Sequence, residues 1–145
     1  NAPVIAKNRN MNITSSIREK TGDYITDINL TVETERRTRN VIGTLYGNKP
    51  RIVEIMNTRI EAELGPNMLF ITNEDKPGFI GSLGSILASY NINIATFHLG
   101  RAKVGGDAIA LIEIDDPVTP ELIDELNKIP QVKSVKPLNF AKNII

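Results

Sequence analysis

Apolar and polar side chains alternate along the first half of the chain, as they do in half-buried β-strands. Between residues 24 and 34, three apolar residues share one face, namely Ile28, Leu30 and Val32. This period of two predicts a strand there. Gly47 and Asn48 predict a turn further on. The elements expected in this half are a helix over 2–10 and strands over 24–34, 36–46, 51–56 and 59–64.

A second domain is predicted after Gly65 and Pro66, because these residues interrupt any regular element. The apolar spacing that follows has the period of a strand, then of an amphipathic helix, and later of strands and a helix again. The expected strands are 68–72, 92–101, 108–115 and 132–137, and the expected helices end at Tyr90 and Lys128. We therefore predict two domains, over 1–64 and 68–145.

The order strand, helix, strand, strand, helix, strand is that of the ferredoxin-like split β-α-β fold. Right-handed crossovers place both helices on one face of the sheet, so we expect the other face to be free for a partner. Asp75 and Thr119 are predicted to cap the two helices, and Asn91 to end the first in a left-handed conformation. The predicted class is α+β, a small strand-rich domain followed by a βαββαβ domain.

Composition narrows the function classes. The chain has 145 residues and a formal net charge of zero, whereas proteins that bind nucleic acid usually carry a basic excess. It has no cysteine and one histidine, His98, so a thiolate nucleophile and a dedicated zinc site are not expected. The sequence offers no pair of a nucleophile and a base that could form a catalytic site. We therefore expect that this chain is not itself an enzyme.

Location and cofactor use are judged from what the sequence lacks. No apolar run approaches the ~20 residues that cross a bilayer, and no secretory leader opens the chain, so we expect a cytoplasmic protein. Gly78, Gly81 and Gly84 follow a strand and enter a helix, but their spacing is not the G-x-G-x-x-G of dinucleotide-binding loops. We expect them to permit close packing of the helix instead.

Five arginines form a loose basic group in the first half, at positions 36, 37, 39, 51 and 59. Guanidinium groups suit carboxylates and phosphates, so one interpretation is an anion-binding pocket. The other, which we favour, is that nearby acids pair with them on solvated strand faces. The acids expected to do so are Glu33, Glu35, Glu54 and Glu61.

Two polar segments carry the most specific information. One runs from Asn73 to Gly78, where a strand ends and a helix starts; the other is Asn91-Ile92-Asn93-Ile94, where the chain returns as a strand. Strands joined through a crossover helix are parallel, so Asp75 and Asn93 are expected at opposite ends of them. A site that used both side chains would need a second subunit.

The region from Met68 to about Phe140 resembles an ACT domain. The D-x-P-G and N-I-N-I elements at this separation are together specific, and Gly105-Gly106-Asp107-Ala108 adds to the match. The first half resembles the intervening domain of the D-3-phosphoglycerate dehydrogenases. That resemblance rests on Asn1-Ala2-Pro3-Val4-Ile5-Ala6-Lys7, Gly43-Thr44-Leu45-Tyr46 and Pro50-Arg51-Ile52-Val53.

Together these matches cover nearly the whole chain, which looks like the C-terminal regulatory region of that dehydrogenase family. The resemblance implies that the NAD-dependent catalytic domain lies elsewhere in a longer protein, with no cofactor in this part. In the family, ACT domains of two subunits pair into one eight-stranded sheet, and L-serine binds at the seam as a feedback inhibitor. The resemblance therefore implies L-serine as ligand and a homodimer or tetramer as the assembly.

Carried onto this sequence, the ligand residues are Asn73, Asp75 and, from the partner subunit, Asn93. The carboxylate of Asp75 can neutralise the ligand ammonium group, and the two amides can bind its carboxylate or hydroxyl. Backbone groups complete the expected set, at Glu74, Lys76 and Ile94.

Arg51 falls where some relatives have a basic residue of a second, anion-binding effector site. Acidic residues, Glu63 and Glu113, stand where other basic residues are expected, so we do not expect that site to be intact. Two alternatives to the dehydrogenase reading stay open. One is the regulatory region of a bacterial L-serine dehydratase, and the other is an oligomerisation module that binds no ligand.

Overall fold

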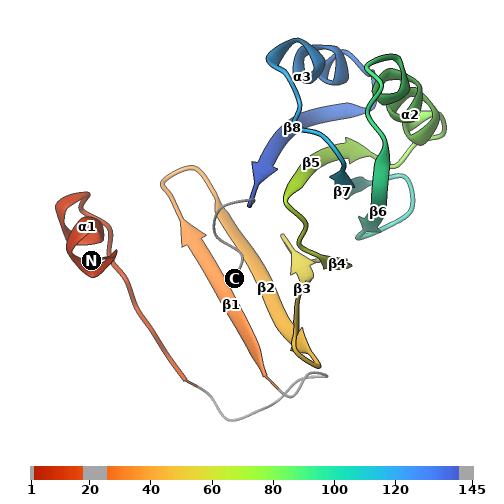
Figure 1. The fold of residues 1–145 in the computed structure, drawn as a ribbon. Coiled ribbons are helices and arrows are strands. Elements are labelled where there is room, and N and C mark those ends of the chain that lie inside the picture. The colour runs from red at the N-terminus through yellow and green to blue at the C-terminus, as the bar shows by residue number, and fades with distance from the viewer. Residues whose placement is uncertain (1, 18–25, 141–145) are drawn as a thin grey trace.

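The computed structural model describes residues 2–17 and 26–140, and it confirms the predicted α+β class (Figure 1). The described residues form two four-stranded antiparallel sheets, and a short helix, α1 (Ala2–Asn8), precedes the first. Residues 24 and 25 of the first predicted strand lie outside the described ranges.

The first sheet is a meander in which each strand pairs with the next in sequence. Its strands are β1 (Asp27–Glu33), β2 (Thr38–Tyr46), β3 (Lys49–Ile55) and β4 (Thr58–Glu63). Two turns use left-handed backbone, at Gly47 and at Met56-Asn57, as tight hairpins require.

A β-bulge in the β3–β4 hairpin decides which side chains meet. Next to the turn, Ile55 pairs with Thr58 and Glu54 with Arg59. The bulge between Ile52 and Glu54 then adds one residue, so that Arg51 pairs with Glu63.

The second sheet has the strand order β6-β7-β5-β8, which is the ferredoxin-like order that the sequence predicts. Its strands are β5 (Asn67–Glu74), β6 (Ile94–Arg101), β7 (Asp107–Ile114) and β8 (Val132–Asn139). The helices α2 (Phe79–Ser89) and α3 (Pro120–Asn127) lie on one face of it (Figure 1).

The main core lies between this sheet and its two helices. Leu83 and Leu87 of α2 meet Leu122 and Leu126 of α3, and all four side chains are fully buried. Truncating such a leucine to alanine costs about 2–5 kcal/mol. This packing holds α2 in place against the sheet, and so it also positions the turn between β5 and α2.

The opposite face of the second sheet is partly covered, so the prediction of a free face is wrong. Ile60 and Ala62 of β4 pack there against Met68, Ile109 and Leu111. The alternate residues of β4 are apolar, and the open face of the second sheet offers them an apolar surface to bury. The first domain thus occupies much of the surface that we expected a partner to use.

The helix ends match the sequence prediction at Asn91 and Thr119 but not at Asp75. Asn91 has a φ of 56° just after α2, and the hydroxyl of Thr119 accepts a hydrogen bond from the Leu122 N–H at 3.3 Å. Asp75 does not cap α2. The residue at the cap position is Gly78, with a φ of 94° and no side-chain bond to the helix. A left-handed backbone there favours glycine.

Candidate functional site

Asp75 lies just after β5 and ties that strand to the β6–β7 turn. Its Oδ2 accepts two hydrogen bonds, from Nη1 of Arg101 at 2.8 Å and from the backbone N–H of Gly105 at 3.1 Å. Its own N–H donates to the carbonyl of Gly106 at 2.8 Å. The hydrogen bond from Arg101, followed by that from Gly105, lowers the pKa of Asp75 below its ordinary value. The side chain is therefore a carboxylate at neutral pH.

Asn73 is a buried polar residue. Among the described residues of the second domain, no other polar residue is buried to the same extent. Its side chain lies in the end of β5, and the residue is 1% exposed. Nδ2 donates to the carbonyl of Glu74 at 2.9 Å, but Oδ1 has no hydrogen-bond partner among the described residues. A buried acceptor without a partner costs about 1–3 kcal/mol. Such a cost is expected where the missing partner is a ligand.

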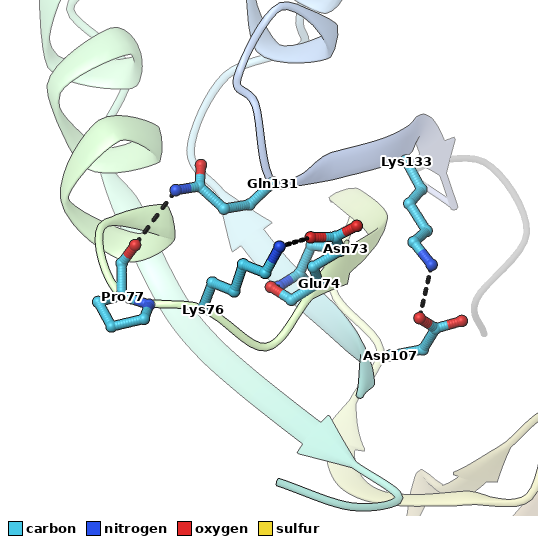
Figure 2. Close-up of polar contacts among 7 residues, drawn as sticks. All are labelled: Asn73, Glu74, Lys76, Pro77, Asp107, Gln131 and Lys133. Atoms are coloured by element: carbon cyan, nitrogen blue, oxygen red, sulfur yellow. Dashed lines mark hydrogen bonds and ion pairs between the residues drawn. The ribbon is translucent and has the colours of Figure 1, made fainter. Parts of the chain in front are cut away.

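The β5–α2 turn is held from both sides, as Figure 2 shows. Lys76 forms an ion pair with Glu74 at 2.5 Å, and this contact is the main cause of the lowered pKa of Glu74. Gln131, at the start of β8, donates from Nε2 to the carbonyl of Pro77 at 3.1 Å. The side chains of Glu74 and Lys76 therefore satisfy one another. Their backbone N–H groups, which we expected to contact a ligand, are also used within the chain, because the Glu74 N–H donates to the Gln131 carbonyl and the Lys76 N–H to the Glu74 carbonyl.

A hollow of about 150 Å³ lies at the start of α2. Asn73 and Asp75 are its polar lining residues near the end of β5, and Phe79, Ile80 and Leu99 supply apolar surface. No side chain caps α2, so the N–H groups of its first turn give this end of the hollow a partial positive charge. Its remaining lining is Lys76, Pro77, Gly78 and Gly81.

The structure places Asn93 and Ile94 at the far end of β6 from Asp75. The amide of Asn93 donates to Oδ2 of Asp115 at 2.9 Å. Eight residues separate it from Arg101, or roughly 25 Å at the rise of a strand. One chain therefore brings Asn73 and Asp75 together but not Asn93, as the crossover geometry requires.

Sequence reasoning missed Arg101. The signal that could have found it is topological, because β5 and β6 are joined through α2 and run parallel. The carboxyl ends of parallel strands lie at the same edge of a sheet. A residue that ends β6 is therefore expected near one that follows β5.

Comparisons with known families match both halves of the chain. Residues 1–56 match the D-3-phosphoglycerate dehydrogenase intervening domain, and residues 67–131 match the ACT domain. The chain therefore joins a D-3-phosphoglycerate dehydrogenase intervening domain to an ACT domain. The second sheet with α2 and α3 thus contains the ACT match, and β1 to β3 lie in the intervening-domain match. We count β4 with the intervening domain because it pairs with β3 in the same sheet.

Whole-chain relatives point the same way. D-3-phosphoglycerate dehydrogenase of Methanocaldococcus jannaschii is 35% identical over 97% of this chain and 26% of its own length. The enzyme of that name from Synechocystis is 32% identical over 92% of this chain and 24% of its own length. This chain therefore spans about a quarter of those relatives. A probable L-serine dehydratase β chain of Bacillus subtilis is 23% identical over 90% of this chain and 60% of its own length.

Arg51 of the intervening domain is far along the chain from the ACT hollow and has local partners. Its Nη2 lies 2.8 Å from Glu63, and its guanidinium lies 5.3 Å from the centre of the Tyr46 ring. Lys49 also approaches Glu63, at 3.7 Å. The acid that pairs with Arg51 is therefore Glu63, and the prediction that another glutamate would do so is wrong. Nε of Arg51 is buried without a partner.

The described residues do not fit a dinucleotide such as the NAD that we expect elsewhere in a longer protein. Dinucleotides bind at the switch point of a parallel sheet, whereas β5, which leads into the glycine-containing α2, has antiparallel neighbours on both sides. Within 2–17 and 26–140 there is also no cluster of three or more histidine, aspartate or glutamate side chains that could hold a metal ion. None of the helices in these ranges is long and apolar enough to span a membrane.

Proposed function

We propose that this chain is an amino-acid-sensing regulatory region, and that two copies bind L-serine between their ACT domains to control a D-3-phosphoglycerate dehydrogenase by feedback. The observation that carries the proposal is the unpartnered Oδ1 of Asn73, buried beside the charged carboxylate of Asp75 in a small hollow. Matches to the intervening and ACT domains support it.

The hollow has the polarity that a small amino acid needs. The ammonium group would lie against Asp75, whose Oδ1 carries no hydrogen bond in the structure because both donors use Oδ2. The buried Oδ1 of Asn73 would accept a bond from the ligand ammonium or hydroxyl. The volume of about 150 Å³ suits a small ligand rather than a nucleotide.

A second copy would bring in the missing Asn93. Within the part of the chain that the structure describes, β6 pairs with β7 on one side only, so its other edge is available to a strand from another molecule. Antiparallel pairing of two β6 strands about their middle, at Phe97 and His98, would set Ile94 of one copy opposite Arg101 of the other. Asn93 of the second copy would then lie next to Asp75 of the first, and a ligand between them would contact both.

Exposed apolar side chains beside this edge favour the same assembly. Ile80 is 55% exposed on α2 and Leu99 is 41% exposed on β6, and both line the hollow. A β6–β6 seam would cover them, as it would the exposed Gly81. Burial of apolar surface drives association. We therefore expect that the same contact between two copies forms the dimer and covers the hollow.

Serine would regulate only by binding one arrangement of the two subunits better than another. A bridge between Asp75 of one copy and Asn93 of the other has that property, since its length depends on how the subunits are placed. The similarity to the L-serine dehydratase β chain is lower in identity than the dehydrogenase matches, so we place the chain with the dehydrogenases.

A thermal-shift titration of the 145-residue chain tests the proposal, with L-serine, D-serine, glycine and other L-amino acids, and with calorimetry on each ligand that responds. A ligand at about a hundred times its Kd adds ~2.7 kcal/mol, which raises Tm by several degrees at this size. An L-serine-selective rise that Asp75→Asn removes is the expected result. No response to any amino acid, from a chain that is dimeric, would leave an assembly domain without a sensor.

A further inference from the structure

The ion pair between Arg101 and Asp75 stands at the border of the hollow. Asp75 is mostly buried, with an 18% exposed side chain, whereas that of Arg101 is 53% exposed. One guanidinium nitrogen, Nη1, bonds to Asp75, and no other hydrogen-bond partner of the Arg101 side chain appears among the described residues. Arginine has five N–H donors, so most of its capacity is open.

The other charges around the β5–α2 turn are already matched. Lys76 pairs with Glu74, and Lys133 pairs with Asp107, as Figure 2 shows. Arg101 and Asp75 are therefore the charged pair with unused bonding capacity at the hollow. The Arg101 end of the pair is half exposed to water, which screens the attraction, so the pair is expected to contribute only modestly to the stability of the fold.

We propose that Arg101 binds the carboxylate of the amino acid whose ammonium group Asp75 binds, so that the pair forms a receptor for a zwitterion. The inference rests on the proposed function and adds to it a residue that decides which ligands bind. The planar guanidinium fork matches a carboxylate in two parallel hydrogen bonds. The Gly105 N–H, which also bonds to Asp75, keeps that carboxylate in place while Arg101 turns one edge to the ligand.

The position of Arg101 on β6 suits this role at a two-fold seam. Leu99 and Arg101 are two residues apart on a strand, so their side chains leave the same face, and Leu99 lines the hollow. In the β6–β6 pairing described above, Arg101 would lie opposite Ile94 of the other copy and beside its Asn93. The ligand carboxylate would thus be held where the two subunits meet.

A site with one positive and one negative group favours ligands that carry one negative and one positive group. We expect α-amino acids to bind, and amines without a carboxylate, or carboxylates without an amine, to bind far more weakly. Specificity against uncharged alcohols and sugars follows from the same pair, because such ligands would leave both charges poorly matched.

The test compares L-serine with L-serinamide, which keeps the ammonium and hydroxyl groups but has no carboxylate. Calorimetry at pH 6, where both α-amino groups are charged, would measure each ligand on the wild-type 145-residue chain and on Arg101→Gln. We expect Arg101→Gln to weaken L-serine binding by about ten- to a hundredfold and to leave the weaker binding of L-serinamide nearly unchanged. Arg101→Lys, which keeps the charge but loses the fork, should fall between.

The matched control is Lys128→Gln, which removes one lysine from an exposed ion pair with Glu125 on the far helix of the same domain. It should bind both ligands as the wild type does. Equal losses for L-serine and L-serinamide in Arg101→Gln would show that Arg101 only positions Asp75, and would overturn the inference alone. Failure of the wild-type chain to bind any amino acid would overturn the proposed function together with it.

Discussion

Gly100 lies directly against the backbone of Arg59, so closely that a Cβ at position 100 would come within 2.3 Å of the Arg59 carbonyl oxygen. β4 of the intervening domain therefore crosses β6 of the ACT domain with no side chain between the two backbones. The neighbours of Gly100 on β6 are Leu99, which lines the hollow, and Arg101, which holds Asp75. Consecutive residues of one strand thus form the contact between the two domains and part of the candidate ligand site.

Gly100→Ala tests how tightly the two domains meet. The added methyl group has to displace the Arg59 backbone, and overpacking of this kind costs about 1–3 kcal/mol. Urea unfolding should show this loss. Gly84→Ala is the control, because a Cβ there meets nothing within 4 Å and alanine is the better helix former by about 1 kcal/mol. Equal stability of the two variants would contradict the close approach.

Asn73→Leu should separate stability from ligand binding. Leucine has the same branching and number of side-chain heavy atoms and removes the unpartnered Oδ1, at the cost of the single bond from Nδ2 to Glu74. We expect the free energy of unfolding to stay within about 1 kcal/mol of the wild type or to rise, while the L-serine response disappears. Thermal denaturation with and without L-serine measures both. A large loss of stability would mean that the amide has a structural role.

The pKa of Asp75 predicts how the site responds to acid. Arg101 and then Gly105 lower it below the ordinary value of 3.8, so folding favours the carboxylate. The stabilising contribution is complete above the unfolded pKa, and it is lost as pH falls through the lower folded pKa. Ligand binding should therefore persist at pH 5 and fail only below 3.8.

A carbon-13 NMR titration of the Asp75 carboxyl group measures this directly. In Arg101→Gln the largest cause of the lowered pKa is removed, so the midpoint should move up toward 3.8. The same midpoint in both proteins would show that the ion pair does not persist in solution.

Ile80→Glu should prevent assembly without unfolding the chain. Ile80 is 55% exposed at the edge where the second copy is proposed to dock, and a charge buried at that seam would be unpaired. Sedimentation equilibrium should give a dimer for the wild type and a monomer for the variant. Leu45→Glu, which changes a 62% exposed residue of the intervening domain, should remain dimeric. If Ile80→Glu also remains dimeric, the seam lies elsewhere.

Glu63 decides whether the basic group of the intervening domain can bind an anion. It accepts Arg51 at 2.8 Å and lies 3.7 Å from Lys49, so it neutralises part of their charge. Glu63→Gln should let inorganic phosphate bind at least about tenfold more tightly than in the wild type, measured by calorimetry. Glu54→Gln is the control, since Glu54 instead accepts a hydrogen bond from Asn40. Equal phosphate binding by all three proteins would contradict this.

The order of strands and helices could be predicted from the sequence because each element of the ACT domain has a clear apolar period. The start of α2 could not, since Asp75 and Gly78 are both acceptable cap residues by type. The choice between them depends on tertiary contacts: Arg101 and Gly105 hold Asp75 away from the helix. The side chain that looked like a cap is instead part of the candidate site.

The partner of Arg51 shows a second limit of the sequence. Counting back from the β3–β4 turn, a regular hairpin would place Arg51 opposite Ala62, and the bulge moves it to Glu63. The residue pattern does not reveal a bulge, so the acid that pairs with Arg51 was not among those predicted. The covered face of the ACT sheet could not be predicted for a similar reason. The sequence shows that Ile60 and Ala62 are apolar, but which surface they bury depends on how the two sheets pack.

The alternation of β6 has an evolutionary consequence. Its even-numbered residues from Thr96 to Gly100 face the side on which β4 packs, while Phe97, Leu99 and Arg101 face the helices and the hollow. Mutations at the odd positions can alter the preferred ligand while the union with the intervening domain is left intact, and mutations at the even positions can do the reverse. A lineage could thus acquire a new effector, or lose one, through substitutions on one face of a single strand.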